Sequence, residues 1–217
     1  VSNTATSMLL DIGIGAASSE TVLIPDLAAG YVLAEATSNA FASYYFPIFI
    51  PANSRISARC QALIASDTVN CRVHLFQRPT GGGAWVGTRV TAYGANSSTS
   101  RGVDCTHGNN SYGTAVALDG STGNPIKYIQ IGMQGGADTS LSDYRVLADL
   151  RIGASTSIAG PLMGSVDTGL ESVLFTAGNQ TLARMGFNLP SGQDLRIAGM
   201  VNGTTNNVLD YIAYGVD

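Results

Sequence analysis

Charged side chains are scarce in this sequence. They make up 12% of the 217 residues, and lysine occurs only once, as Lys127. Proteins that bind nucleic acid or anionic membrane surfaces do so through clustered Lys and Arg side chains, and this sequence has no such cluster. The formal net charge is −4. The composition therefore argues against nucleic acid and against a membrane surface as partners.

The sequence also lacks a long apolar run. Its longest apolar stretches, such as residues 43–51 and 172–177, are far shorter than the ~20 residues with which a helix spans a bilayer. The residues that follow Val1 show neither the basic region nor the apolar core of a secretory signal. We therefore expect no membrane insertion, and we expect synthesis in a cytoplasm.

Cysteine is rare, and the metal-binding patterns that it could support are weak. The three cysteines, Cys60, Cys71 and Cys105, are too few for a disulfide scaffold. A Cys60–Cys71 bridge stays open, because residues on neighbouring strands meet disulfide geometry only in some registers. Cys71 and His74 lie three apart and so face opposite sides of a strand. Cys105 and His107 form another possible pair of metal ligands, but tetrahedral zinc needs four ligands that converge. We therefore expect no metal and no cofactor.

Glycine and small polar residues are abundant, and apolar residues alternate with polar ones in short stretches. Such alternation predicts half-buried β-strands. It is clearest in residues 55–63, where Ile56, Ala58, Cys60 and Ala62 share one face. It recurs in residues 69–75 with Val69, Cys71, Val73 and Leu75 on one face, so these two stretches predict a β-hairpin with both cysteines pointing inward.

The same pattern predicts further strands, and nothing supports a long helix. The strands are expected at residues 9–14, 45–50, 88–93, 126–133, 144–152, 172–176, 183–189, 195–201 and 208–214. Short helical turns are conceivable only at residues 26–35 and 162–171. Two long polar loops, residues 78–87 and 95–112, complete the pattern, which predicts an all-β fold of the β-sandwich or jelly-roll type.

Comparison of the sequence with itself shows a repeat. The segment Asp11–Ala16 returns as Asp149–Ala154, at an offset of 138 (149 minus 11). Three later segments return in the same order: Ile50-Pro51 as Leu189-Pro190 at an offset of 139, Arg55–Ala58 as Arg196–Gly199 at 141, and Ala92–Asn96 as Ala213–Asp217 at 121. The repeat predicts a fuller β unit in residues 1–152, followed by a smaller one in residues 153–217 that partly copies it.

Candidate catalytic groups do not form a recognisable pattern. Phosphate-binding loops, zinc-protease helices and nucleophile elbows are absent from the sequence. Acidic pairs for glycoside hydrolysis can be drawn from five loop aspartates, but no spacing selects a pair; they are Asp67, Asp104, Asp119, Asp138 and Asp143. We therefore predict that the protein is not an enzyme.

Aromatic residues supply the only candidates for ligand binding. Trp85 and Tyr112 lie in or beside the two long loops, where β scaffolds usually carry binding functions, and a surface glycan is the ligand expected for them. Tyr44, Tyr45 and Phe46 form, together with Trp85, a group of aromatics that are candidates for a carbohydrate-stacking surface or for subunit contacts. Core and interface packing is the preferred interpretation of that group.

Three segments resemble virion structural proteins of tailed bacteriophages: Leu10–Glu20, Val22–Pro25 and Ile50–Arg59. The resemblance lies mainly in the first 150 residues. It implies a β-sandwich or jelly-roll subunit of the tail, baseplate or fibre, or else a capsid decoration protein. It carries over no catalytic residue. The implied protein is made in the host bacterial cytoplasm, is located in the virion, and assembles as a homo-oligomer, trimeric or higher, with other virion proteins. A lectin-like module remains the alternative.

Overall fold

The computed structural model describes residues 6–32, 43–62, 69–76, 87–135, 146–153, 161–167, 189–201 and 208–217. Within these residues there are strands and no helix, so the predicted all-β class is confirmed. The strands are β1 (Thr6–Ile14), β2 (Thr21–Val32), β3 (Ile56–Ala62), β4 (Val90–Tyr93), β5 (Val103–Thr106), β6 (Gly108–Asn109), β7 (Val116–Asp119), β8 (Tyr128–Gly135), β9 (Val146–Ile152), β10 (Pro161–Asp167), β11 (Leu195–Val201) and β12 (Val208–Val216).

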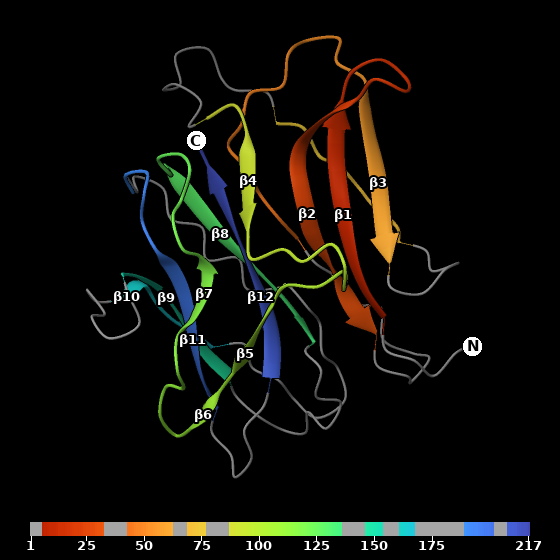
Figure 1. The fold of residues 1–217 in the computed structure, drawn as a ribbon. Helices are drawn as coiled ribbons and strands as arrows, with labels where there is room; N and C mark the ends of the chain where they lie inside the picture. The colour runs from red at the N-terminus through yellow and green to blue at the C-terminus, as the bar shows by residue number, and fades with distance from the viewer. Residues whose placement is uncertain are drawn as a thin grey trace.

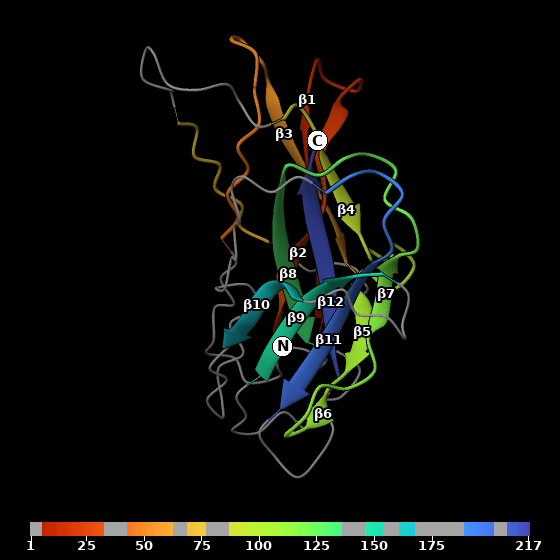
Figure 2. The same ribbon diagram turned by 90° about the vertical axis from the view of Figure 1, so that its left-hand side faces the viewer.

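These strands form three packed sheets. The first has the order β2-β1-β3, and the second has the order β10-β9-β11-β6 with β7 also paired to β11. The third contains β12, which pairs with β4 and β5 along one edge and with β8 along the other. Figures 1 and 2 show this third sheet between the other two, which makes it the central layer.

Strand β12 is the centre of the fold, because both of its faces are buried. Leu209, Tyr211 and Ala213 belong to the apolar core shared with β9 and β11. Ile212 and Tyr214 belong to the core shared with β1 and β2. Side chains alternate across a strand, so one apolar run supplies two cores at once.

The Tyr214 hydroxyl connects the central sheet to the free edge of β2. It donates to the backbone oxygen of Asp26 (2.9 Å) and accepts from the backbone N–H of Ala28 (2.8 Å). The Tyr44 hydroxyl donates to the oxygen of Ala28 at 2.8 Å. The buried Tyr214 and the half-buried Tyr44 thus satisfy backbone groups that no neighbouring strand pairs within the described residues.

Removal of the Tyr214 hydroxyl is expected to destabilise the protein. Tyr214→Phe leaves a buried N–H and a buried carbonyl without this partner, which costs about 1–3 kcal/mol. Urea unfolding measures the change. Tyr45→Phe is the control, since Tyr45 is 48% exposed and its change is expected to stay within about 0.5 kcal/mol. Equal stabilities of the two variants would show that the hydroxyl contributes nothing.

The first and second sheets share one pairing pattern. Adding 138 to a β1 residue and 139 to a β3 residue converts each of the seven β1–β3 pairs into a β9–β11 pair; Ile12 opposite Ala58 becomes Leu150 opposite Ile197. Adding 138 and 139 also converts the β1–β2 pair Ile12–Ile24 into the β9–β10 pair Leu150–Met163. Two register shifts in the β1–β2 pairing, on either side of Ile24, occur at the equivalent places on either side of Met163 in the β9–β10 pairing.

The turns that connect these strands correspond too. Gly15 and Gly153 both have positive φ, and they donate their N–H groups to the backbone oxygens of Arg55 and Asp194. Each acceptor lies two residues after a turn residue of positive φ, which is Asn53 in the first sheet and Gly192 in the second. The correspondence supports the repeat that the sequence predicts. It also corrects one detail, because the Arg55 and Arg196 motifs, 141 apart, are not structurally equivalent. The structural offset stays at 139.

The division into residues 1–152 and 153–217 remains a proposal. Strand β11 pairs with β6 and β7, and β12 pairs with β4, β5 and β8. Strands from both proposed units therefore complete the same sheets.

Several local predictions were wrong. Residues 69–76 form no strand, so the predicted hairpin with β3 is absent, and Cys60 and Cys71 are exposed instead of inward. Residues 45–50 make only an isolated bridge, at Ile48. The two conceivable helical turns are strands over their described parts, β2 and β10, and the 95–112 loop contains β5 and β6. The strand predicted at 172–176 lies outside the described residues, as does the one at 183–189 apart from Leu189, which forms an isolated bridge.

Candidate functional site

Five large apolar side chains are exposed along two neighbouring stretches of the chain. They are Tyr45, Phe49, Val73, Leu75 and Phe76, which we call the apolar strip. Leu75 is 62% exposed and Phe76 is 70% exposed. The rings of Tyr45 and Phe76 lie 6.2 Å apart, which joins the two stretches. Large apolar patches on folded proteins mark interaction surfaces, and the Tyr45–Phe76 contact is the one that brings the two stretches together here.

The aromatic group predicted at residues 44–46 is divided between core and surface. Tyr44 and Phe46 pack edge-on against Tyr214, with ring centroids 5.4 Å and 5.9 Å away. Tyr45 instead joins the apolar strip. Since alternate residues point to opposite sides of an extended chain, one short aromatic run supplies both packing and exposed surface.

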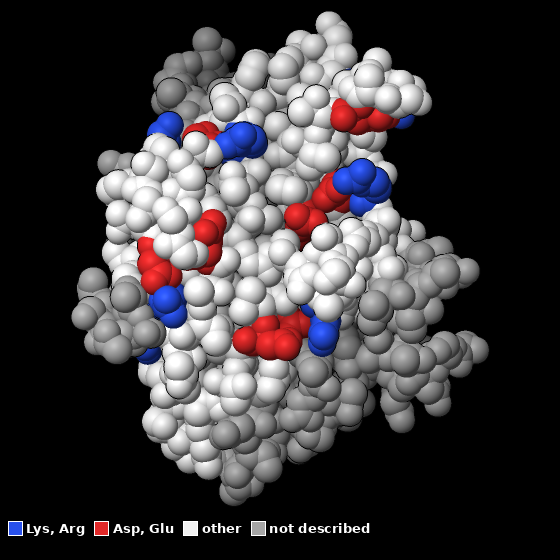
Figure 3. Space-filling model, viewed as in Figure 1, with Lys and Arg blue, Asp and Glu red and all other residues white. Residues whose placement is uncertain are grey.

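Charge does not define a site on the face in Figure 3. Acidic and basic side chains lie there in small groups separated by uncharged surface. Several arginines are paired with carboxylates, as in Arg55–Glu20 (2.5 Å), Arg89–Asp217 (3.0 Å) and Arg196–Asp194 (2.8 Å). Ion pairs at the surface contribute little energy, and among the described residues on this face they leave no large area of one charge sign.

Of the two predicted ligand-binding residues, one is described. Trp85 lies outside the described residues. Tyr112 is half-buried next to β9, where its hydroxyl donates to Asp149 (2.8 Å) and the Arg151 guanidinium lies 4.8 Å from its ring centroid. Contact with the guanidinium orients the ring. A role for Tyr112 in glycan binding stays a prediction.

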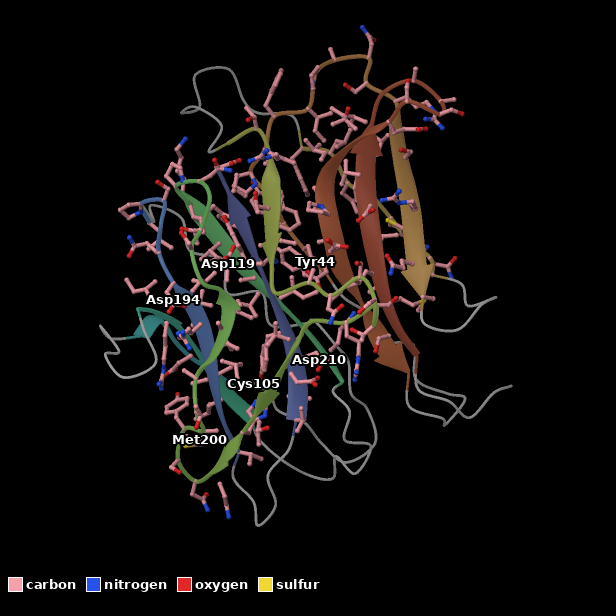
Figure 4. All side chains as sticks on the ribbon, in the orientation of Figure 1. Tyr44, Cys105, Asp119, Asp194, Met200 and Asp210 are labelled. Carbon is pink, nitrogen blue, oxygen red and sulfur yellow. The ribbon has the colours of Figure 1, made fainter. Side chains whose placement is uncertain are left out.

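The structure brings together two aspartates that the sequence did not pair. Asp104 on β5 lies directly opposite Asp210 on β12. Asp210 is fully buried, and neither of its carboxylate oxygens accepts a hydrogen bond from the described residues. Arg101 Nε is 3.6 Å from Asp210 Oδ2, beyond hydrogen-bond distance. Figure 4 shows Asp210 on β12 with Cys105 on the neighbouring β5.

The pKa of Asp210 is raised to about 8, first by burial and then by the facing Asp104, while Arg101 opposes the shift. Asp210 is therefore protonated at neutral pH. A buried neutral acid next to an exposed carboxylate is not accessible to a polymeric substrate, so this pair does not form a glycosidase site. Of the other candidate acids, Asp119 accepts a turn N–H from Ser121, while Asp67, Asp138 and Asp143 lie outside the described residues.

The soft-metal candidates do not come together. His107 is buried, with Nε2 2.8 Å from the Tyr211 hydroxyl, and the Cys105 thiol lies 3.9 Å from the backbone oxygen of Ile197. Burial raises the pKa of Cys105 to about 11, so this thiol is un-ionised and unreactive. Within the described ranges, no three His, Cys, Asp or Glu side chains lie close enough to hold a metal ion. Cys60 and Cys71 are not bridged.

Sequence reasoning missed Asp210, although a signal was present. It is the only charged residue in the apolar run Val208–Val216, and one charge within a buried strand is a marker of unusual protonation. The apolar strip carried a signal as well, because Val73 and Leu75 were assigned to an inward face, whereas both side chains are exposed.

No family model and no curated protein matches this sequence. Two solved structures are weakly similar. The crystal structure of the infectious bursal disease virus VP2 subviral particle is 12% identical with a TM-score of 0.34, and the alignment covers 98% of this chain and 55% of that one. The structure of infectious bursal disease virus Gx strain is 10% identical with a TM-score of 0.32, covering 98% and 56%.

The chain thus spans about half the length of these viral chains. TM-scores this low assign neither a topology nor a function. No helix in the described part of the chain has the length and apolarity needed to cross a membrane.

Proposed function

We propose that this chain is a non-enzymatic structural component of a virus particle, which acts by assembling with copies of itself and with other virion proteins. The observation that carries the proposal is the apolar strip. Its side chains are 46–70% exposed, and burial against a partner returns roughly 25 cal/mol for each Å² of apolar surface.

The sequence resemblance narrows the proposal to the tail, baseplate or fibre of a tailed phage, in a trimer or higher oligomer, with capsid decoration as the alternative. Tail proteins and decoration proteins differ in where they remain when a particle is dissected. Mass spectrometry of heads and tails separated from purified virions distinguishes them. Presence in neither fraction would contradict both locations.

Self-assembly is tested with the purified chain. Light scattering coupled to size-exclusion chromatography is expected to show an oligomer at micromolar concentration, and the oligomer should dissociate when the apolar strip is made polar. The double variant Leu75→Ser and Phe76→Ser removes two of its most exposed members. A chain that is monomeric at every concentration would contradict the proposed function.

Recognition of a host surface glycan is a second candidate, favoured by the Tyr112 ring that Arg151 and Asp149 hold in place. Glycan-array binding is expected to fall at least tenfold in Tyr112→Ala, because stacking against the sugar is lost. Tyr112→Phe keeps the ring and should retain most of the binding. Wild-type chain that binds no glycan on a broad array would overturn this candidate.

A further inference from the structure

We propose that the open edge of β3 accepts residues 69–76 of a second copy of this chain as an added β-strand. This inference rests on the proposed function, since it names the surface through which copies assemble. Its basis is the correspondence between the first and second sheets.

The strand equivalent to β3 is covered on the edge where β3 is open. In the second sheet β11 takes the place of β3, and its outer edge pairs with β7 along Leu195–Ile197 and with β6 at Met200 and Val201. Within the described residues, β3 pairs with β1 alone and is the last strand of its sheet. Figure 1 shows β3 at the outer border of the molecule.

The difference in pairing is also a difference in burial. On β11, Ile197 and Ala198 are fully buried. The equivalent β3 residues, Ala58 and Arg59, are exposed, as is Cys60 next to them. An exposed edge strand presents backbone N–H and C=O groups to any strand of matching length, and natural proteins usually cover such edges. The second sheet covers its edge, and the first has no cover among the described residues.

Residues 69–76 have the sequence pattern of a β-strand, but they pair with no strand among the described residues. Val69, Cys71, Val73 and Leu75 alternate with polar residues, a period that fits one face of a sheet. Among the described residues, no backbone hydrogen bond joins this segment to another part of the chain. Val73 is 46% exposed and Leu75 62% exposed. Within the described part of the chain, no strand therefore pairs with the backbone of this segment or covers its Val73 and Leu75 side chains.

The occupant is a second copy because the complementary pieces occur in the same sequence. A hairpin between β3 and residues 69–76 fits the alternation of both, yet within one chain the two are not paired. Exchange of an identical element between protomers satisfies the same pairing from another copy. The antiparallel alignment of β7 on β11 gives the direction, so the added segment runs antiparallel beside Ile56–Ala58.

The native cysteines test the pairing directly. Cys60 and Cys71 are both exposed, whereas Cys105 is fully buried. We expect a short bismaleimide to join Cys60 of one copy to Cys71 of another and to produce covalent dimers or larger species. Cys60→Ser and Cys71→Ser should each abolish them, while Cys105→Ser should leave them unchanged.

Crosslinking in a mixture of ¹⁴N-labelled and ¹⁵N-labelled chains distinguishes pairing between two copies from a hairpin between β3 and residues 69–76 of the same chain. Crosslinked peptides of mixed label show that two copies are joined. Crosslinks confined to one label would place the hairpin within one chain and overturn the inference. An assembled sample that yields no Cys60–Cys71 crosslink would also overturn it and leave self-assembly standing. A monomer at every concentration would count against the proposed function itself.

A matched pair of substitutions tests the segment without cysteines. Val73→Asp places a charge on the exposed face of residues 69–76, and we expect the dissociation constant of the assembly to rise at least tenfold. Val22→Asp is the control, because Val22 is similarly exposed (38% against 46%) but lies on β2. Equal dissociation constants for Val73→Asp and wild type would contradict the strand exchange.

Discussion

Gly199→Ala is expected to lower the free energy of unfolding by about 3 kcal/mol or more, through overpacking and a weakened buried hydrogen bond. A Cβ at Gly199 would overlap the ring of His107, which directly follows β5 and is fully buried against β11 and β12. That ring cannot move without disturbing the 2.8 Å contact between its Nε2 and the Tyr211 hydroxyl. The glycine is therefore required by close approach and not by its backbone conformation.

Urea unfolding of the purified variant checks this result, with Gly123→Ala as the matched control. A Cβ at Gly123 meets no atom within 4 Å, so its variant is expected to stay within about 0.5 kcal/mol of wild type. His107→Ala in the Gly199→Ala background removes the overlap. The double variant is expected to be about as stable as His107→Ala alone, because the added Cβ no longer meets a ring. A Gly199→Ala change no larger than that of the control would refute the packing argument.

Strands with two-sided burial or clean alternation were predictable from the sequence. Residues 195–201 were predicted with the bounds that β11 has, and Val208–Tyr214 falls within β12. In both segments the fully buried residues are apolar apart from Asp210, so the local pattern and the tertiary environment agree at the other positions. The Asp11 and Asp149 motifs likewise identified β1 and β9 as equivalent strands before any pairing was known.

Strands that contain an irregular step were not predictable in the same way. In β2, Pro25 and Asp26 interrupt the alternation, and Asp26 has a φ of 53° where the register with β1 shifts. A proline followed by a left-handed residue is typical of a turn, so the local signal pointed away from a strand. Long-range pairing with β1 overrides it.

The candidate sites were harder to predict, because they depend on which side chains stay exposed and on which strands become neighbours in the fold. Alternation in residues 69–75 correctly indicated a strand-like segment, but it could not tell whether the apolar face is buried within the chain. Asp104 and Asp210 are 106 residues apart (210 minus 104), and only the β5–β12 register makes them neighbours. Tyr112 was selected as a loop aromatic, whereas its contacts to Asp149 and Arg151 arise from the fold.

The contribution of Asp210 to the stability of the protein is expected to fall as pH rises from about 4 to about 8. Its pKa is about 8 in the folded chain, against an ordinary value of 3.8. Between these values the unfolded chain has released a proton that the folded chain still holds. The folded state therefore loses stability with rising pH, by at most ~1.4 kcal/mol per pH unit, and the loss ends above the folded pKa.

Asp210→Asn isolates this contribution, since the amide resembles the protonated acid in shape and stays neutral at every pH. The other carboxylates titrate alike in wild type and in the variant. The difference between the two unfolding free energies therefore reports the titration of Asp210 alone. The variant is expected to be close to wild type near pH 4 and several kcal/mol more stable at pH 9, as measured by urea unfolding across this range.

Asp104→Asn provides the second arm of the experiment. Loss of the facing carboxylate removes one cause of the raised pKa, although burial remains the larger cause. In Asp104→Asn the unfolding free energy should therefore stop falling at a lower pH than in wild type. Below that pH, it should still fall with the same slope. If Asp210→Asn instead changes stability by the same amount at pH 4 and pH 9, Asp210 is ionised in the folded protein. The buried carboxyl would then be held as a charge by Arg101, and the argument from burial would be wrong.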